Sequence, residues 1–368
     1  MDAMSSALWV EERLCNTATQ RRIPLGGSLE LLPLCNMNCD MCYVRMSREE
    51  MEEVGRLRTM EEWTKTAEDM MKAGTLFVLL TGGEPLLYPH FRELYQKLRE
   101  LGMIITINTN GTLIDEAWAD FFAENKPRRI NITLYGASNE TYERLCHYPG
   151  GFDKAVNGIR LLRERNIDVK VNGSLAKANV DDRMKIIELG ESLDAPVRID
   201  TYMYPSVRER NHAYNNQARL DPEMAAKARV EVLQREMGEE VFAQYRKIQL
   251  DEAENTPEGE AVPGQMACRA GKSSFVVNWQ GEMRSCVVLD KPSIPLRDVE
   301  FEKAWELTKK GTESLRISAR CSSCKLRKVC NTCVAAAIAE TGKADGVPEY
   351  LCRYTEATVR YLKETSKK

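Results

Sequence analysis

Short apolar runs alternate with amphipathic segments from Leu29 to about Met203. The runs are rich in branched aliphatic residues and are bounded by polar or glycine-containing segments, which is typical of β-strands. The six predicted strands are Leu29–Leu34, Leu76–Leu80, Ile104–Asn108, Ile130–Tyr135, Val169–Leu175 and Val197–Met203.

Apolar residues recur with helical spacing between these strands. The pattern predicts a helix over Met60–Ala73, with Thr59 as its N-cap and Gly74 at its C-terminal end. Six strands in series with helices between them predict a parallel sheet with helices on its outer face. A closed eight-unit barrel needs ~250 residues, and this stretch has about 175. The other predicted helices are Phe91–Leu101, Asp115–Glu124, Phe152–Arg165 and Asp181–Leu193.

Charged helical patterns and then a cysteine-rich segment follow the last predicted strand. Asp221–Leu250 predicts one or two helices, and Asp251–Gly264 combines Pro and Gly with acidic residues, which predicts a linker. Seven of the twelve cysteines lie between Cys268 and Cys352. We therefore expect an N-terminal extension (1–28), a sheet-and-helix domain (29–220), a helical segment with linker (221–264) and a cysteine-rich domain (265–368).

Charge and hydropathy exclude several classes of protein. A net charge of −3 and a pI near 5.9 argue against a general nucleic-acid binder. No apolar run approaches the ~20 residues that span a bilayer, and Met1–Asn16 lacks the apolar core of a signal peptide. We expect a cytoplasmic protein with neither nucleic acid nor membrane as a partner. Cysteines in that reducing compartment indicate metal sites more than disulfides.

Three cysteines in one loop carry the clearest chemistry. Cys35, Cys39 and Cys42, called here the N-terminal triad, follow the first predicted strand. Thiolates hold Fe–S clusters, and three thiolates leave one corner of a four-iron cluster without a protein ligand. An open metal position is where chemistry occurs. A zinc site would need a fourth ligand, often histidine, and the three histidines of the chain lie away from this loop. Unliganded core thiols are the remaining alternative.

A second loop, Thr81-Gly82-Gly83-Glu84-Pro85, follows the second predicted strand. Barrel enzymes bind ligands at the C-terminal ends of their strands, so both loops are expected at one edge. Together the two motifs resemble the radical S-adenosylmethionine (SAM) superfamily. The resemblance implies a partial (β/α)6 barrel of TIM type and a [4Fe-4S] cluster on the N-terminal triad. It also implies that Gly82–Pro85 binds SAM, with Glu84 receiving its ammonium group.

The C-terminal cysteines form another pattern. Cys321, Cys324, Cys330 and Cys333 would suffice for one zinc site, but three further cysteines would then stay unexplained. The full pattern resembles the SPASM extension of peptide-modifying radical SAM enzymes, which holds two auxiliary Fe–S clusters. The family more often has three residues, not two, between the cysteines matched by Cys330 and Cys333. The resemblance implies a distal quartet of Cys321, Cys324, Cys330 and Cys352, and a proximal trio of Cys268, Cys286 and Cys333.

The proximal trio lacks the fourth cysteine that some family members carry shortly after the first. Residues 269–285 contain no cysteine. We therefore expect an iron with an open or non-cysteine ligand there, or a cluster with fewer irons.

The N-terminal triad also departs from the family pattern. The family has an aromatic residue before the third cysteine, where this chain has Met41, and Tyr43 follows the cysteine instead.

Polar residues at the ends of predicted strands are candidates for contacts with SAM. Asn108 and Asn110 end the third strand, where a polar turn is the alternative interpretation. Arg144 stands where related enzymes hold the SAM carboxylate, and bidentate recognition favours arginine for this role; a solvated helix arginine is the alternative. The other candidates are Tyr43, Thr133, Tyr135, Asn172 and Ser174, followed by Asp200 and Tyr202. Arg208, Arg210 and His212 indicate a solvated charge cluster or a site for an acidic peptide, and Cys15 and Cys146 indicate buried spare thiols.

The resemblance implies that the reduced cluster cleaves SAM to methionine and a 5′-deoxyadenosyl radical, which abstracts a substrate hydrogen. The expected substrate is a ribosomal peptide or protein side chain, modified by cross-linking through a thioether or carbon–carbon bond, by epimerisation or by oxidation. Maturation of a haem-type tetrapyrrole is the second interpretation, and a non-catalytic Fe–S electron carrier is the third. A reductant such as flavodoxin or ferredoxin is an implied partner. Since 34 residues precede Cys35, leader-peptide recognition would need a separate protein.

Overall fold

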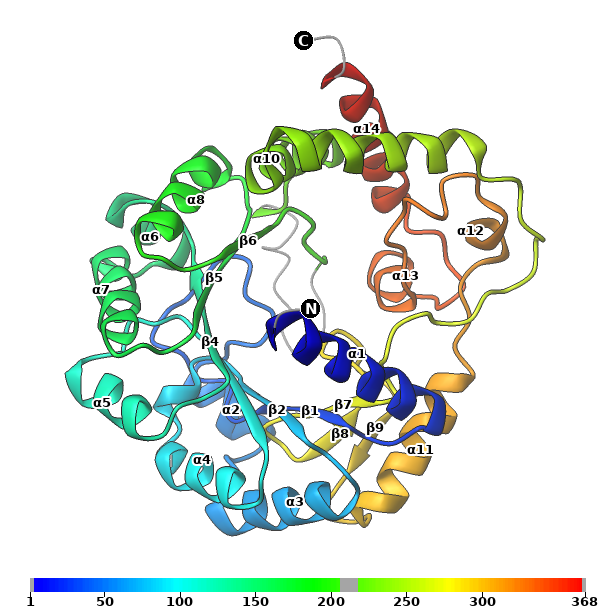
Figure 1. Ribbon diagram of the computed structural model, residues 1–368. Helices are drawn as coiled ribbons and strands as arrows, with labels where there is room; N and C mark the ends of the chain where they lie inside the picture. Colours follow the sequence, from blue (N-terminus) through cyan, green and yellow to red (C-terminus); the bar gives the residue numbers. More distant parts are fainter. Residues whose placement is uncertain (1–2, 206–217, 366–368) are drawn as a thin grey trace.

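One sheet of nine strands organises the protein. The computed structural model describes residues 3–205 and 218–365, so Arg208, Arg210 and His212 lie outside the described residues. The strand order is β6-β5-β4-β3-β2-β1-β7-β8-β9, and Figure 1 shows helices around the outside of the curved sheet. The strands are β1 Gly26–Glu30, β2 Phe77–Thr81, β3 Ile104–Thr109, β4 Arg129–Leu134, β5 Val169–Ser174, β6 Val197–Asp200, β7 Ser274–Val277, β8 Glu282–Arg284 and β9 Ser293–Pro295.

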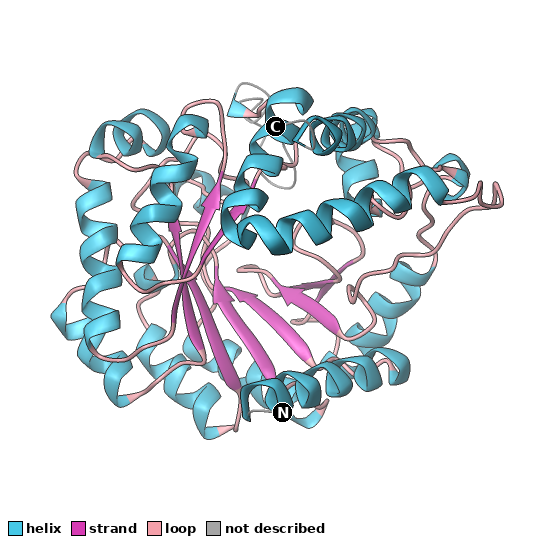
Figure 2. Cartoon of the chain, turned by 45° about the horizontal axis from the view of Figure 1, so that its top comes forward, coloured by secondary structure: helices cyan, strands magenta, loops and turns pink. Residues whose placement is uncertain are grey.

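The first six strands form the predicted parallel sheet. Each pairs in parallel with the next along the chain, from β1 with β2 to β5 with β6. Burial alternates along β2 to β5, because one face of each strand packs under the helices and the other lines the interior of the barrel. Figure 2 shows the strands side by side with helices packed around them. Among the described residues β6 and β9 do not pair with each other, so the sheet stays open, which confirms the partial barrel.

The first strand begins earlier than its apolar run predicts. It spans Gly26–Glu30 instead of Leu29–Leu34. Backbone pairing with the second motif continues beyond it, since Gly83 N donates to Leu32 O and Glu84 N donates to Leu34 O, at 2.8 and 2.9 Å. Pro33 lacks an N–H and interrupts the regular ladder. The two motifs are therefore held together by the backbone immediately before Cys35.

The predicted helices between the strands are confirmed. Thr59 caps α3 in a capping box with Glu62, and Gly74 follows the helix with a φ of 96°. The sequence patterns did not predict α1, α2 and α6, nor the C-terminal helices α11 to α14. The helices are α1 Ala3–Arg21, α2 Arg48–Val54, α3 Met60–Lys72, α4 Phe91–Glu100, α5 Glu116–Glu124, α6 Asn139–Cys146, α7 Gly151–Glu164, α8 Arg183–Ser192, α10 Pro222–Asn255, α11 Phe301–Glu313, α12 Ala319–Ser323, α13 Val334–Thr341 and α14 Glu349–Glu364.

The C-terminal region completes the sheet instead of forming a detached unit. Strand β7 pairs in parallel with β1, and β8 and β9 add antiparallel strands beyond it. Helix α10 bends at Gly238, where φ is 70° and ψ is 170°, and it packs along α14. Figure 1 shows α10 and α14 together on the side of the ring opposite β1. In the described part of the chain, no helix is both long enough and apolar enough to cross a membrane.

Candidate active site

A cavity of about 560 Å³ lies at the C-terminal ends of the barrel strands. This volume falls within the range of small-molecule sites. The structure brings most of the sequence candidates into this one cavity. Its lining includes Cys35, Cys39, Cys42, Tyr43, Gly82, Gly83, Asn108, Asn110, Thr133, Tyr135, Asn172, Ser174, Asp200 and Tyr202.

The loop of the N-terminal triad is anchored to the end of α6. Asn38 N donates to Cys146 O and Asp40 N donates to Leu145 O, each at 3.0 Å. Just beyond the helix, His147 Nε2 lies 2.7 Å from Asp40 Oδ1. The loop is thus positioned by helix-end carbonyls that have no partner within the helix.

The three thiols of this loop lie close together, with Cys39 buried and Cys35 and Cys42 half-buried. Burial and the nearby Glu84 carboxylate raise the pKa of Cys35 well above its ordinary value. A hydrogen bond with Cys146 and then burial raise the pKa of Cys39. The sequence presents Cys146 as a spare thiol, and the structure places it against a triad member. Three thiolates in this loop would place three negative charges close together, which is unfavourable unless a cation neutralises them. The irons of an Fe–S cluster supply that positive charge, so the donor set fits such a cluster.

Gly82 and Gly83 allow the second motif to approach the first. A Cβ atom on Gly82 would lie 2.5 Å from Leu32 O, and one on Gly83 would lie 2.2 Å from Leu34 O. Both distances are shorter than any tolerable contact. The glycines are therefore needed for close backbone packing, and they line the cavity as well.

Glu84 lies behind the cavity wall and is fully buried. Its Oε1 accepts hydrogen bonds from Leu86 N at 3.1 Å and Thr109 Oγ1 at 2.8 Å, and its Oε2 accepts one from Asn110 N at 2.8 Å. Burial raises its pKa to about 7 against the opposing effect of these donors. The carboxylate holds the ends of β2 and β3 together, and its predicted contact with the SAM ammonium group stays a prediction.

A polar network fixes Asn110 beside the triad. Its Nδ2 donates to Asn36 Oδ1 at 2.8 Å and lies 3.7 Å from Cys35 Sγ. Its Oδ1 accepts from both the N–H and the hydroxyl of Thr112. These residues form a polar turn, but Asp115 caps α5, so the turn does not cap the next helix. The predicted contacts of Asn108 and Asn110 with SAM stay predictions.

Besides Glu84, two further sequence candidates do not line the cavity. Pro85 begins a short 3-10 turn and is buried. Arg144 lies on the exposed side of α6, where Nη2 donates to Ala178 O at 2.6 Å and Nη1 lies 3.9 Å from Glu140 Oε1. The helical position turns the guanidinium away from the strand ends, so the structure does not bring it to the site.

The sequence analysis missed two cations that do line the cavity, Lys170 on β5 and Arg198 on β6. Alternation along β5 places Lys170 on the same face as Asn172 and Ser174, so this signal was present in the sequence. It also missed the apolar wall supplied by Met41, Met203, Tyr204, Val287 and Val288. The last two residues follow Cys286 directly and bring the C-terminal region to the cavity.

The C-terminal cysteines gather in two places. The four members of the distal quartet line a cavity of about 140 Å³. In the proximal trio, burial and then the neighbouring Cys268 and Cys333 raise the pKa of Cys286, while backbone hydrogen bonds lower it. Among residues 3–205 and 218–365, no three Cys, His, Asp or Glu side chains converge on a single-ion site. A four-iron cluster is larger than one ion and holds its thiolates further apart.

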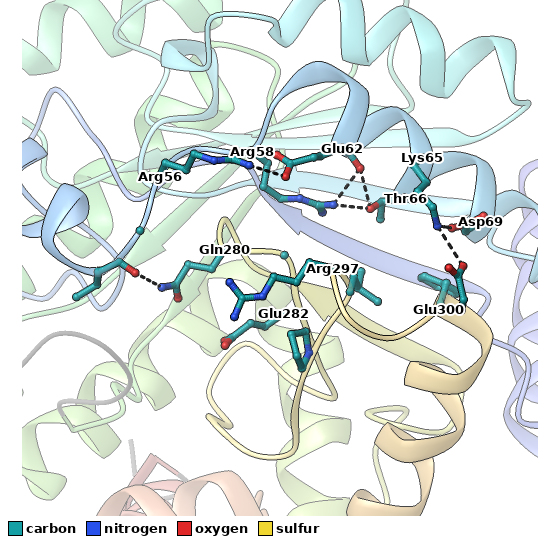
Figure 3. Close-up of a pocket in the computed structure, with 16 residues that line it drawn as sticks. Arg56, Arg58, Glu62, Lys65, Thr66, Asp69, Gln280, Glu282, Arg297 and Glu300 are labelled. Carbon is teal, nitrogen blue, oxygen red and sulfur yellow. Dashed lines mark hydrogen bonds and ion pairs between the residues drawn. The ribbon is translucent and has the colours of Figure 1, made fainter.

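A second cavity of about 420 Å³ lies on the outside of the barrel, between α3 and the β8–β9 hairpin. Figure 3 shows its charged lining. Arg56 Nη2 lies 2.8 Å from Glu62 Oε1, and Lys65 Nζ lies 2.9 Å from Asp69 Oδ2 and 3.1 Å from Glu300 Oε2. These charges neutralise one another across the seam between the two regions, so this cavity resembles a solvated interface more than a ligand site.

Comparison with known proteins agrees with this geometry. Residues 29–190 match the family model of the Radical SAM superfamily. The AdoMet-dependent heme synthase of Methanosarcina barkeri is 25% identical over 326 residues, which cover 85% of this chain and 92% of that protein. The subtilosin biosynthesis protein AlbA of Bacillus subtilis is 25% identical over 73% of this chain and 56% of that protein.

Among solved structures, Streptococcus suis SuiB bound to its precursor peptide SuiA superimposes with a TM-score of 0.66 at 17% identity, covering 92% of this chain and 79% of that one. This likeness concerns the fold. The paired motifs in one cavity, the matched family model and relatives aligned over most of the chain lead to one conclusion. Residues 29–190 of this protein form a radical SAM domain, and the chain is similar over most of its length to radical SAM enzymes.

Proposed function

We propose that this radical SAM enzyme modifies a haem-type tetrapyrrole that it holds by carboxylate groups. The observation that carries this proposal is Lys170, a partly buried cation inside the reaction cavity. Among the described residues its amino group makes no hydrogen bond or ion pair. Burial and the neighbouring Arg198 and Arg129 lower its pKa, whereas Asp200 and Glu236 raise it. A carboxylate ligand would compensate this charge.

The surroundings of Lys170 suit an anion with a large apolar body. Arg198 lies one strand away, and its Nε is 3.4 Å from Asp200 Oδ1, a pair that solvent screens because both side chains are more than half exposed. The wall of Met41, Met203, Tyr204, Val287 and Val288 faces the same space. A tetrapyrrole combines apolar ring faces with a carboxylate rim, and a relative that is covered over 92% of its own length is a heme synthase.

The chain's own residues prepare the cavity for radical chemistry. A bound cluster and SAM would supply one-electron reductive cleavage of SAM. The N-terminal triad would hold the cluster, Gly82 and Gly83 bring the SAM loop beside it, and Asn110 fixes Cys35. Tyr135 is half-buried, and it lines the cavity beside the triad. An electron donor such as flavodoxin or ferredoxin remains a predicted partner.

A ribosomal peptide or protein side chain is the second candidate substrate. AlbA, a bacteriocin biosynthesis protein, aligns with 73% of this chain, and SuiB shares the fold with its precursor peptide bound. Against it, AlbA is covered over only 56% of its length. Thioether formation, carbon–carbon cross-linking, epimerisation and oxidation remain the outcomes to test for this class, with a separate leader-binding protein as an implied partner.

Binding of iron coproporphyrin III tests the first candidate. We expect saturable absorbance changes with the reconstituted enzyme, about tenfold weaker binding in Lys170→Met, and no binding of the tetramethyl ester, which lacks carboxylates. Lys65→Met, in the outer cavity, is the matched control. Unchanged porphyrin binding in Lys170→Met, together with loss of SAM binding, would assign Lys170 to the SAM carboxylate and overturn the tetrapyrrole proposal.

A further inference from the structure

Tyr204 lies between the reaction cavity and the proximal trio. Its side chain lines the cavity, and its hydroxyl lies 3.7 Å from Cys333 Sγ. Tyr204 and Cys333 both pack against the main core and against the small C-terminal core of Met266, Ala270, Leu289, Val334 and Ala335. This one side chain therefore separates the space for substrate from a cysteine of the trio.

The Cys333 sulfur lies at the N-terminus of a helix. Cys333 is the N-cap of α13, and its Sγ accepts a hydrogen bond from Ala336 N at 3.3 Å. The positive end of the helix dipole is directed at the sulfur. A thiolate has no proton to give, so in a bound cluster the Tyr204 hydroxyl must be the donor of the contact with Cys333.

The ring of Tyr204 is held in place by a second tyrosine. The ring of Tyr202 packs edge-on against it, with centroids 5.0 Å apart. The Tyr202 hydroxyl is directed elsewhere, 3.4 Å from Glu340 Oε1. The two tyrosines are thus neighbours with different hydroxyl partners.

We propose that Tyr204 is a positioning residue for the proximal Fe–S cluster, whose hydroxyl donates to the Cys333 thiolate and thereby sets the reduction potential of that cluster. A hydrogen bond to a cluster sulfur stabilises the more negatively charged reduced state and raises the potential. The inference rests on the proximal auxiliary cluster that the family resemblance implies. Tyr204 would then have two roles, since it lines the cavity and also sets the reduction potential of the proximal cluster.

The test uses the full-length protein with the N-terminal triad replaced by alanine, so that only auxiliary iron is bound. Tyr204→Phe and the control Tyr202→Phe are compared with this parent by iron content and by a redox titration followed by electron paramagnetic resonance. We expect equal iron in all three proteins. For Tyr204→Phe we expect an equilibrium constant for reduction lower by about tenfold, which is ~59 mV for one electron. The distal cluster and Tyr202→Phe should show no shift.

Two results would overturn the inference in different ways. Full iron with an unchanged proximal potential in Tyr204→Phe, or an equal shift in Tyr202→Phe, removes the role of the Tyr204 hydroxyl and leaves the cluster assignment intact. A parent protein that binds no auxiliary iron removes the proposed clusters and, with them, the inference.

Discussion

Replacing Glu84 by glutamine should stabilise the protein above neutral pH. The folded state raises the pKa of this fully buried carboxyl from 4.5 to about 7, so the native state binds a proton that the unfolded chain has released. Stability contributed by the protonated group is therefore present below pH 4.5 and is lost as the pH rises towards 7. At 1.36 kcal/mol per pH unit, the loss is about 3 kcal/mol.

Glutamine resembles the protonated acid, because one of its two terminal groups is a donor, and it does not titrate. We therefore expect Glu84→Gln to match wild type near pH 4.5 and to exceed it by up to about 3 kcal/mol above pH 7. The assay is urea unfolding of the iron-free proteins at several pH values, followed by circular dichroism. Glu164→Gln, at an exposed position on α7, controls for the change in net charge.

Parallel pH profiles for wild type and Glu84→Gln, or a variant that is less stable at pH 8, would refute this reasoning. The same variant also tests the sequence prediction for Glu84. If the carboxylate receives the ammonium group of SAM, the iron-loaded variant loses SAM affinity. If it only joins the ends of β2 and β3, SAM affinity changes little.

Three further predictions follow from other parts of the structure. Replacing the N-terminal triad by alanine should remove about four irons per protein and abolish 5′-deoxyadenosine formation after reduction, measured by iron analysis and chromatography; product from the triple variant would contradict the site. Gly83→Ala should lower the free energy of unfolding by about 3 kcal/mol or more, because the added Cβ would lie 2.2 Å from Leu34 O. A variant with the urea midpoint of wild type would contradict this prediction and show that the backbone at Leu34 can shift to make room. Arg219→Met should lower the free energy of unfolding by about 3–5 kcal/mol, because Arg219 Nη2 lies 2.6 Å from Glu340 Oε1 and both side chains are almost wholly buried. Arg48→Met, at an exposed ion pair, should change the free energy of unfolding by less than about 1 kcal/mol.

Local patterns were sufficient to predict most of the barrel. The strands from β2 to β6 begin within one residue of their apolar runs, since burial on one face produces an alternation that the sequence displays. The first strand was misplaced because Leu31, Leu32 and Leu34 are as apolar as a strand but lie in the irregular segment that joins the two motifs. Helix α6 was missed because eight residues carry too little periodicity.

The parts of the candidate site that could be predicted are those whose residues form a contiguous sequence motif. The triad and the glycine pair do line one cavity. Arg144 was not brought there, because sequence position relative to a family does not determine the direction of a helical side chain. The contact between Tyr204 and Cys333 joins residues 129 positions apart. The spacing of apolar and polar residues along the chain reports local structure, so it could not predict this contact.

The parallel pairing of β7 with β1 has a consequence for how the protein is made. The strand that leads into the N-terminal triad obtains its second neighbour only when Ser274–Val277 has emerged from the ribosome, about 240 residues after Cys35. Non-local parallel pairs of this kind form slowly. Throughout that interval β1 is an edge strand with unpaired backbone groups, and the thiols beside it lack their final cover. The N-terminal triad thus reaches its final surroundings late in synthesis. This favours insertion of iron and sulfide into the complete chain and not into a nascent one.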